Sequence, residues 1–309
     1  MTPLPTHTPY DGSSKLFTIG VKPLDPAGWI EIDDHLLPYL AEKRRLYAEI
    51  PEQVFVEEAG TREAQQEVLD LLGPYLVEKR PDIYRRGDTG IEVAGAPERP
   101  ALPSSLEDAP LVAASLLVQE DLILMRRDDS GWRLVAGSLC FPSSWVLVEK
   151  FGRPLQDIHA PVPGFGPGTR PAELISRMFD GLQGQAVERY NWSIQSGDVL
   201  YHPLSDLQRI DRATNRPSRF PGGDIDAHAF IRVERQTLRK LPVSRDILFT
   251  IRIHLDPLAV LARHPDRATL AASFADQLEA LDLAQLDYKG MTSDRDRLIV
   301  LLNHMANDG

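Results

Sequence analysis

Three segments in the second half of the chain alternate apolar and polar residues, and this alternation constrains the fold more than any other feature. The segments span residues 190–194, 228–238 and 247–255. A period of two residues is that of a β-strand, whose side chains point to opposite faces in turn. Three such segments, separated by stretches rich in turn residues, predict an antiparallel sheet with one face buried.

The first two of these strands each have one polar face. The polar positions are Arg189, Asn191 and Ser193 in the first strand, and Arg232, Glu234 and Gln236 in the second. The face of the second strand is either a solvated surface with cross-strand ion pairs or the wall of a pocket in which a carboxylate holds an ammonium group or relays a proton, and no role is assigned to Arg189 and Asn191 of the first. The residues alone leave both interpretations open.

Periodicity and turn residues predict the other elements. Apolar residues three and four positions apart predict helices over residues 36–50, 61–79, 171–182, 266–281 and 293–307. Further strands are predicted over residues 111–118, 122–126 and 131–141. The segments without regular periodicity are expected to form a loosely attached arm (1–18), a surface connector (80–108) and a loop that acts as a lid (203–226).

This order of elements predicts an α+β chain. An N-terminal helical region with its connector would span residues 1–108, and a sheet core with inserted short helices would span residues 109–260. C-terminal helices packed on that core would span residues 261–309.

The segment after the strand at 131–141 holds one histidine between rigid turns. Ser143 and Ser144 can cap a short helix, because their hydroxyls accept hydrogen bonds from free backbone N–H groups. A second short helix begins on Pro154, ends at His159, and is followed by prolines that prevent its continuation. An imidazole held in this way is well placed to ligate a metal.

A lone histidine at a helix end is more often a cap than a ligand, because its cation suits the negative end of the helix dipole. No second His or Cys lies three or four residues from His159, so a tetrahedral zinc site is not indicated. Haem, however, needs few protein ligands, because the porphyrin supplies four. Alternative ligands are His35, His202, His228, His254 and the thiolate of Cys140. Cys140 lies late in an apolar strand, where a buried inert thiol is more typical.

Several long motifs resemble those of the haem-dependent oxidative N-demethylase family. They are P-S-S-W-x-x-x-x-K-x-G-x-P-L-x-x-I-H-x-P-V-P from Pro142, R-V-E-R-Q-T-L-R-K-L-P-V-S from Arg232 followed by I-L-F-T-I-R, Y-N-W-S-I from Tyr190, and G-V-K-P-L-D-P-A-G-W from Gly20. The motifs occur in the family's order, span about residues 20–257 and are far more specific than one short pattern.

The resemblance implies a PAS-like, haem-binding subunit that removes a methyl group from a small dialkylamine such as dimethylamine. It would be a monooxygenase with haem b, and its carbinolamine product would break down to formaldehyde and a primary amine. By resemblance His159 is the proximal iron ligand and Glu234 acts on the substrate. The other cofactor contacts implied are Trp145, Lys150, Arg153 and Arg232. Two alternatives remain: a haem-based PAS gas sensor, and a haem-free, non-catalytic subunit.

Composition limits the partners. With 34 basic and 45 acidic residues, the formal net charge of −11 disfavours nucleic acid and anionic membrane. The single cysteine excludes an intramolecular disulfide and an iron–sulfur cluster, and no glycine-rich loop suits a dinucleotide. Electrons from NAD(P)H would therefore arrive through a separate flavin/iron–sulfur reductase, in a hetero-oligomeric assembly. The sequence has no signal-peptide pattern or membrane-span pattern, so a cytoplasmic location is expected.

Overall fold

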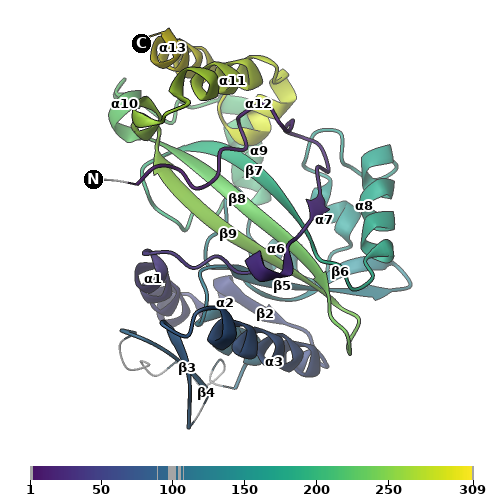
Figure 1. The fold of residues 1–309 in the computed structure, drawn as a ribbon. Helices are drawn as coiled ribbons and strands as arrows, with labels where there is room; N and C mark the ends of the chain where they lie inside the picture. The colour runs from purple at the N-terminus through teal and green to yellow at the C-terminus, as the bar shows by residue number, and fades with distance from the viewer. Residues whose placement is uncertain (1–2, 89, 97–101, 104–105, 107, 308–309) are drawn as a thin grey trace.

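An antiparallel sheet organises the molecule. The computed structural model describes residues 3–88, 90–96, 102–103, 106 and 108–307. In this part of the chain the main sheet has seven strands in the order β1-β7-β8-β9-β5-β6-β2 (Figure 1). They are β1 (Lys22–Pro23), β2 (Phe55–Glu57), β5 (Asp121–Asp128), β6 (Gly131–Ser138), β7 (Val187–Ser196), β8 (Ala229–Lys240) and β9 (Ile247–Pro257). A separate pair consists of β3 (Tyr84–Gly87) and β4 (Gly90–Val93).

Helices cover the sheet and link its strands. Those before the first long strand are η1 (Pro26–Gly28), α1 (Leu36–Glu49), α2 (Pro51–Val54), α3 (Arg62–Lys79) and α5 (Pro110–Ser115). Those inserted between strands are α6 (Leu147–Lys150), α7 (Leu155–His159), α8 (Arg170–Gly181), α9 (Asp206–Asn215) and α10 (Ile225–His228). The last are η2 (Leu258–Arg263), α11 (Arg267–Glu279), α12 (Leu283–Lys289) and α13 (Arg295–Asn307). In Figure 1 the last three helices lie at the opposite end of the sheet from α1 and α3. The predicted α+β fold is confirmed.

The strand register confirms the predicted faces of β7 and β8. Asn191 pairs with Glu234, and Arg189 pairs with Gln236, so their side chains share one face. On the other face Trp192 packs against Phe274 of α11, with 4.7 Å between the ring centroids. The apolar face is therefore covered by C-terminal helices, and the polar face is left for a site.

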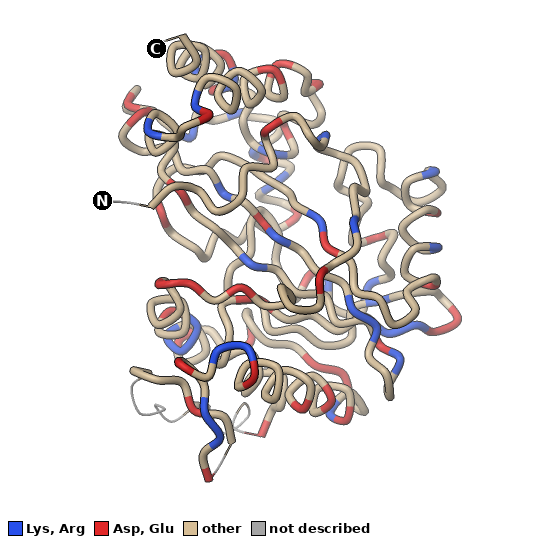
Figure 2. Tube along the Cα trace, viewed as in Figure 1, with Lys and Arg blue, Asp and Glu red and all other residues tan. Residues whose placement is uncertain are grey.

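Lys and Arg positions also occur along the strands of the sheet (Figure 2). Arg232, Arg235 and Arg252 are each at most 4% exposed. Buried guanidinium groups need hydrogen-bond partners. Arg235 and Arg252 are paired with Glu188 at 2.8 Å and Asp33 at 2.6 Å, respectively. These pairs tie β8 and β9 to neighbouring segments.

The predicted strand over 111–118 is wrong, because Pro110–Ser115 form the helix α5. The run L-V-A-A-S-L-L-V is apolar except for Ser115, and a short run of this kind does not distinguish a buried helix from a buried strand. Pro110 favours the helix, since it lies in the first turn, where a backbone N–H has no intrahelical partner. The true neighbours of β5 are β6 and β9.

Three segments predicted to be irregular contain regular or buried structure. The N-terminal arm is not loosely attached, because Tyr10 is fully buried and stacks on Phe274. The connector 80–108 contains β3 and β4. The predicted loop 203–226 contains α9, which begins with a capping box between Ser205 and Gln208.

The segment leading to His159 differs in detail from the prediction. The third predicted strand ends at Ser138 rather than at residue 141. The serines at 143 and 144 do not cap α6, whose N-cap is Val146 without a side-chain hydrogen bond. Ser144 instead adopts a left-handed φ of 64°. The helix ending at His159 is present as α7. In the described part of the chain, no helix has the length and apolar character needed to cross a membrane.

Candidate functional site

The polar face of the sheet forms one wall of a large cavity. The opposite wall comes from the segment between β6 and the end of α8, and α9 and α12 contribute to the rim. The cavity has a volume of ≈ 260 Å³. Apolar side chains from both walls include Ile123, Met125, Leu134, Phe141, Ile158, Val162, Phe165, Phe249 and Ile251. The cavity is thus apolar in its walls, with polar groups concentrated on β7, β8 and the rim.

His159 lines this cavity from the end of α7. Burial, together with the nearby cations Arg189 and Lys150, lowers the pKa of His159 to about 4, although the backbone of Leu155 acts in the opposite direction. The ring is therefore neutral at pH 7. A neutral imidazole has a ring nitrogen with a lone pair that can ligate a metal.

The rim beside His159 has more cations than its carboxylate can neutralise. Asp206 at the start of α9 pairs with Lys150 at 3.3 Å, with Arg209 at 2.9 Å and with Arg153 at 3.5 Å. Lys150 and Arg209 line the cavity, whereas the side chain of Arg153 is 46% exposed and lies outside the lining. Three cations around one carboxylate leave positive charge available to an anionic ligand.

Glu234 is the carboxylate on the sheet wall. Its side chain is 16% exposed and accepts hydrogen bonds from Asn191 at 3.3 Å and Gln236 at 3.0 Å. Arg189 lies on the same wall and donates to Gln236 at 3.0 Å, but its buried Nε has no hydrogen-bond partner. An unpartnered buried N–H is costly, so this atom indicates a missing acceptor in the cavity.

Lys289 is the last residue of α12. Like Arg189, it is a cation of the cavity without a strong anionic partner. It is 6% exposed, and its Nζ donates to the carbonyl of Trp192 at 2.5 Å. Burial, with a further contribution from Arg189 and Arg219, lowers the pKa of Lys289 to about 7. An additional anion in the cavity would therefore stabilise the charged form of Lys289.

A stability experiment tests this depressed pKa. Between pH 7 and 9 the unfolded chain keeps the Lys289 proton that the folded chain loses, so stability rises with pH. We expect the urea midpoint of the ligand-free protein to increase over this pH range. The corresponding increase in the free energy of unfolding is up to about 2 kcal/mol. Lys289→Met should remove the increase, and Lys22→Met, at a side chain 59% exposed, should keep it. The same rise in all three proteins contradicts the assignment.

The other predicted residues fall into two groups. Trp145 lines the cavity with His159, Lys150 and Glu234. Arg232 lies outside the lining, is fully buried, and donates to the carbonyl of Phe141 at 2.6 Å. Its part in the site is to hold that carbonyl, and with it the segment after β6.

The alternative iron ligands do not line the cavity. Cys140 is fully buried outside it, and burial raises the pKa of its thiol far above the usual range. His35, His202 and His228 are exposed, and His254 lies on the opposite face of β9. Among the described histidines, the cavity lining contains His159 alone.

Sequence reasoning left Arg189 and Asn191 unassigned, although their alternation with Tyr190 and Trp192 placed them on the polar face. Four further lining residues were missed, namely Arg209, Arg219, Tyr288 and Lys289. They lie on or near α9 and α12, two helices that were not predicted. The capping box at Ser205 was a usable signal for α9.

Comparison with protein families gives one functional finding. The family model described as "Haem-dependent oxidative N-demethylase, alpha subunit-like" (HODM_asu-like) matches residues 20–299. The matched region contains His159, Glu234 and Lys289, and therefore both walls of the cavity and part of its rim.

Proposed function

The chain belongs to the haem-dependent oxidative N-demethylase alpha subunit-like family, and we propose that it is the haem-binding oxygenase subunit of an enzyme that demethylates a small secondary amine. The observation that carries this proposal is a neutral imidazole, His159, in an apolar cavity whose rim is cationic. The reaction would convert a dimethylamine-like substrate into a primary amine and formaldehyde.

The cavity fits haem b in three respects. Its apolar walls suit the porphyrin faces, and His159 offers one free ring nitrogen as an axial ligand. The charged lining residues are Lys150, Arg189, Arg209, Arg219, Lys289 and Glu234, so cations exceed carboxylates. Two propionate groups would supply the acceptor that Arg189 Nε lacks and a negative charge beside Lys289. Trp145 would pack beside the macrocycle.

Glu234 is the residue we assign to the amine. A secondary amine is protonated at neutral pH, and a carboxylate in a partly dry site binds an ammonium group strongly. Asn191 and Gln236 fix the orientation of this carboxylate by donating to it. Glu234 would thereby hold the substrate nitrogen and accept its proton, which exposes the nitrogen lone pair before oxidation.

Bound haem would supply the activation of O₂ and the two-electron oxidation of the methyl carbon, while the protein orients the amine and excludes water. Reducing equivalents must come from elsewhere, because one cysteine cannot hold an iron–sulfur cluster. We assign their delivery to a separate flavin/iron–sulfur reductase that uses NAD(P)H. The description "alpha subunit-like" is in keeping with an enzyme of several subunits.

The decisive experiment combines two assays on the purified protein. A pyridine haemochrome spectrum should give one haem b per chain. With dimethylamine, O₂ and a reductant, the protein should release formaldehyde and methylamine in equal amounts. Haem without turnover would instead favour a haem-based gas sensor, and a haem-free protein from haem-supplemented cells would favour a non-catalytic subunit.

Removing the charge of Glu234 should weaken amine binding. Glu234→Gln keeps the size and the hydrogen-bonding capacity of the side chain but removes the charge-assisted bond, worth about 1.5–3 kcal/mol. We expect kcat/KM for the amine to fall by about 10- to 100-fold, with the haem spectrum unchanged. Glu78→Gln, at a side chain 75% exposed, is the control. Unchanged kinetics in Glu234→Gln would remove Glu234 from the substrate site.

A further inference from the structure

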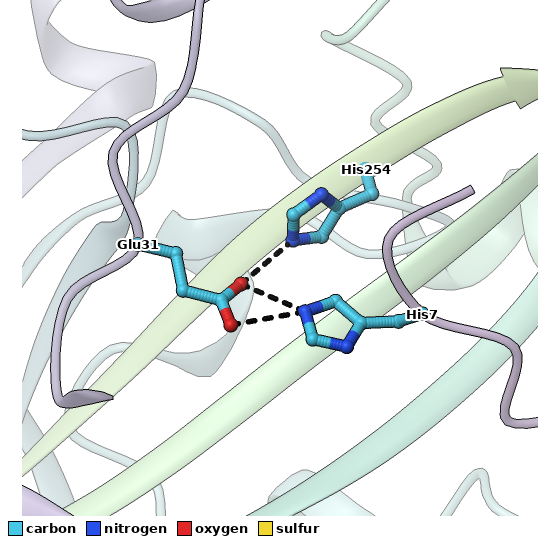
Figure 3. Close-up of side chains that lie close together, drawn as sticks. All are labelled: His7, Glu31 and His254. Carbon is cyan, nitrogen blue, oxygen red and sulfur yellow. Dashed lines mark hydrogen bonds and ion pairs between the residues drawn. The ribbon is translucent and has the colours of Figure 1, made fainter. Parts of the chain in front are cut away.

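Two imidazoles and a carboxylate meet on the face of the sheet opposite the cavity (Figure 3). His7 comes from the N-terminal arm, Glu31 from the segment before α1, and His254 from β9. Glu31 Oε2 is 2.9 Å from Nε2 of His7 and 3.0 Å from Nε2 of His254. One potential ligand atom from each of the three residues lies within 4.8 Å of the other two. Three segments far apart in sequence thus converge on one carboxylate oxygen.

The charges around this cluster favour a cation. Burial opposes ionisation of Glu31, but the hydrogen bonds from His254 and His7 hold its pKa well below the usual range. Arg235 lies 3.4 Å from the other carboxylate oxygen, yet it is 2.8 Å from Glu188 and donates at 2.6 Å to the carbonyl of Gly28. Its charge is therefore already compensated, and Oε2 of Glu31 remains directed at the two imidazoles.

A second carboxylate stands beside the cluster. Asp256 is two residues after His254 on β9, so both side chains point to the same face. Its carboxylate is half-buried, and among the described residues no hydrogen bond or ion pair engages it. It lies outside the three-residue cluster itself, so it is a candidate for an additional oxygen ligand only after a local rearrangement.

We propose that His7, Glu31 and His254 bind one zinc ion, which fastens the N-terminal arm to the sheet. Two imidazoles and one carboxylate are a known zinc ligand set, whereas Mg²⁺ and Ca²⁺ prefer oxygen alone. Zinc bonds of about 2.0–2.2 Å place tetrahedral ligand atoms about 3.3–3.5 Å apart, so each imidazole needs to move away from Oε2 of Glu31 by only a few tenths of an ångström. The two imidazole nitrogens already lie within 4.8 Å of one another. Water or Asp256 would complete the coordination.

The position of the site indicates a structural role. None of the three ligands lines the cavity, and the arm that carries His7 continues to Tyr10, buried against Phe274 of α11. Zinc would therefore hold the arm across β9 and stabilise its contact with the C-terminal helices. The same arm continues to Phe17 and Thr18, which line the cavity.

The test uses the full-length, tag-free protein with Zn²⁺ as the probe. After removal of metals with a chelator, calorimetric titration at pH 7.5 should show one zinc per chain, and elemental analysis after dialysis should retain it. His7→Ala and His254→Ala should each weaken binding at least tenfold. His228→Ala, at an exposed histidine on α10, is the matched control and should bind as the unmodified protein does.

Two further measurements test the structural role. Zinc should raise the thermal midpoint of the unmodified protein and slow trypsin cleavage after Lys15, and His7→Ala should lose both effects. The circular dichroism of His7→Ala should stay unchanged, because the residue lies on a peripheral arm. The proposal is overturned if no stoichiometric zinc binds, or if His7→Ala binds it undiminished. If the three residues are held together by hydrogen bonds alone, no stoichiometric zinc will bind.

Discussion

His159→Ala is expected to abolish stoichiometric haem binding, so that the purified variant lacks the Soret band of the unmodified protein. The reason is geometric, because His159 is the one described histidine in the cavity lining and its ring is neutral at pH 7. Loss of a residue that merely supports a metal ligand typically costs about 10- to 100-fold in affinity, and loss of the ligand itself should cost at least that. Haem content per chain, measured as the pyridine haemochrome, is the readout.

Two comparisons separate a ligand role from a structural one. Free imidazole added to His159→Ala should restore a Soret band, because the cavity left by the side chain admits the missing ligand. His228→Ala, at an exposed residue, should retain full haem content. If His159→Ala keeps one haem per chain with an unaltered spectrum, the iron ligand lies elsewhere and the proposed role of His159 is wrong.

The sheet wall of the site was predictable because strand alternation is a local property. A period of two fixes which side chains share a face, and the register of β7 with β8 then brings Asn191 opposite Glu234. The same is true of His159, since proline positions and the short α7 are set by neighbouring residues. These parts of the site depend on short stretches of sequence.

The rim of the cavity was not predictable in this way. Lys289 reaches the site because α12 packs against the chain beside β7, where its ammonium group bonds to Trp192 almost a hundred residues earlier in the sequence. Arg209 depends on the position of α9, a helix with no buried residue, whose apolar Leu207 and Ile210 are exposed. Arg232 has the residue type of a propionate contact, but its guanidinium donates to the carbonyls of Phe141 and Leu200, and its Nε lies 3.9 Å from Glu234. Tertiary packing decided all three positions.

Asp121→Ala should be the most destabilising of the substitutions considered, by about 3–5 kcal/mol. Asp121 is fully buried at the start of β5 and accepts hydrogen bonds from the backbone N–H of Cys140 at 2.8 Å and of Phe141 at 2.9 Å. Its charge also favours the protonated form of the fully buried Lys43, whose ammonium donates to Ser115 and to the carbonyl of Glu120. The alanine variant would leave two N–H groups unpaired and remove a negative charge that stabilises the Lys43 ammonium. Urea unfolding is the measurement.

The network around Asp121 gives this prediction a specific signature. Because the penalty comes largely from the charge left behind on Lys43, the double variant Lys43→Met/Asp121→Ala should be more stable than the sum of the single effects, by about 1–3 kcal/mol. Asp70→Ala, at an exposed carboxylate, should change stability by less than about 0.5 kcal/mol. Additive effects in the double variant would show that Lys43 and Asp121 act independently.

Phe141 lines the cavity and its carbonyl accepts a hydrogen bond from Arg232, so loss of Asp121 should also loosen the wall beside the proposed haem. Faster haem release from Asp121→Ala than from Asp70→Ala would therefore connect the buried charge pair to the site.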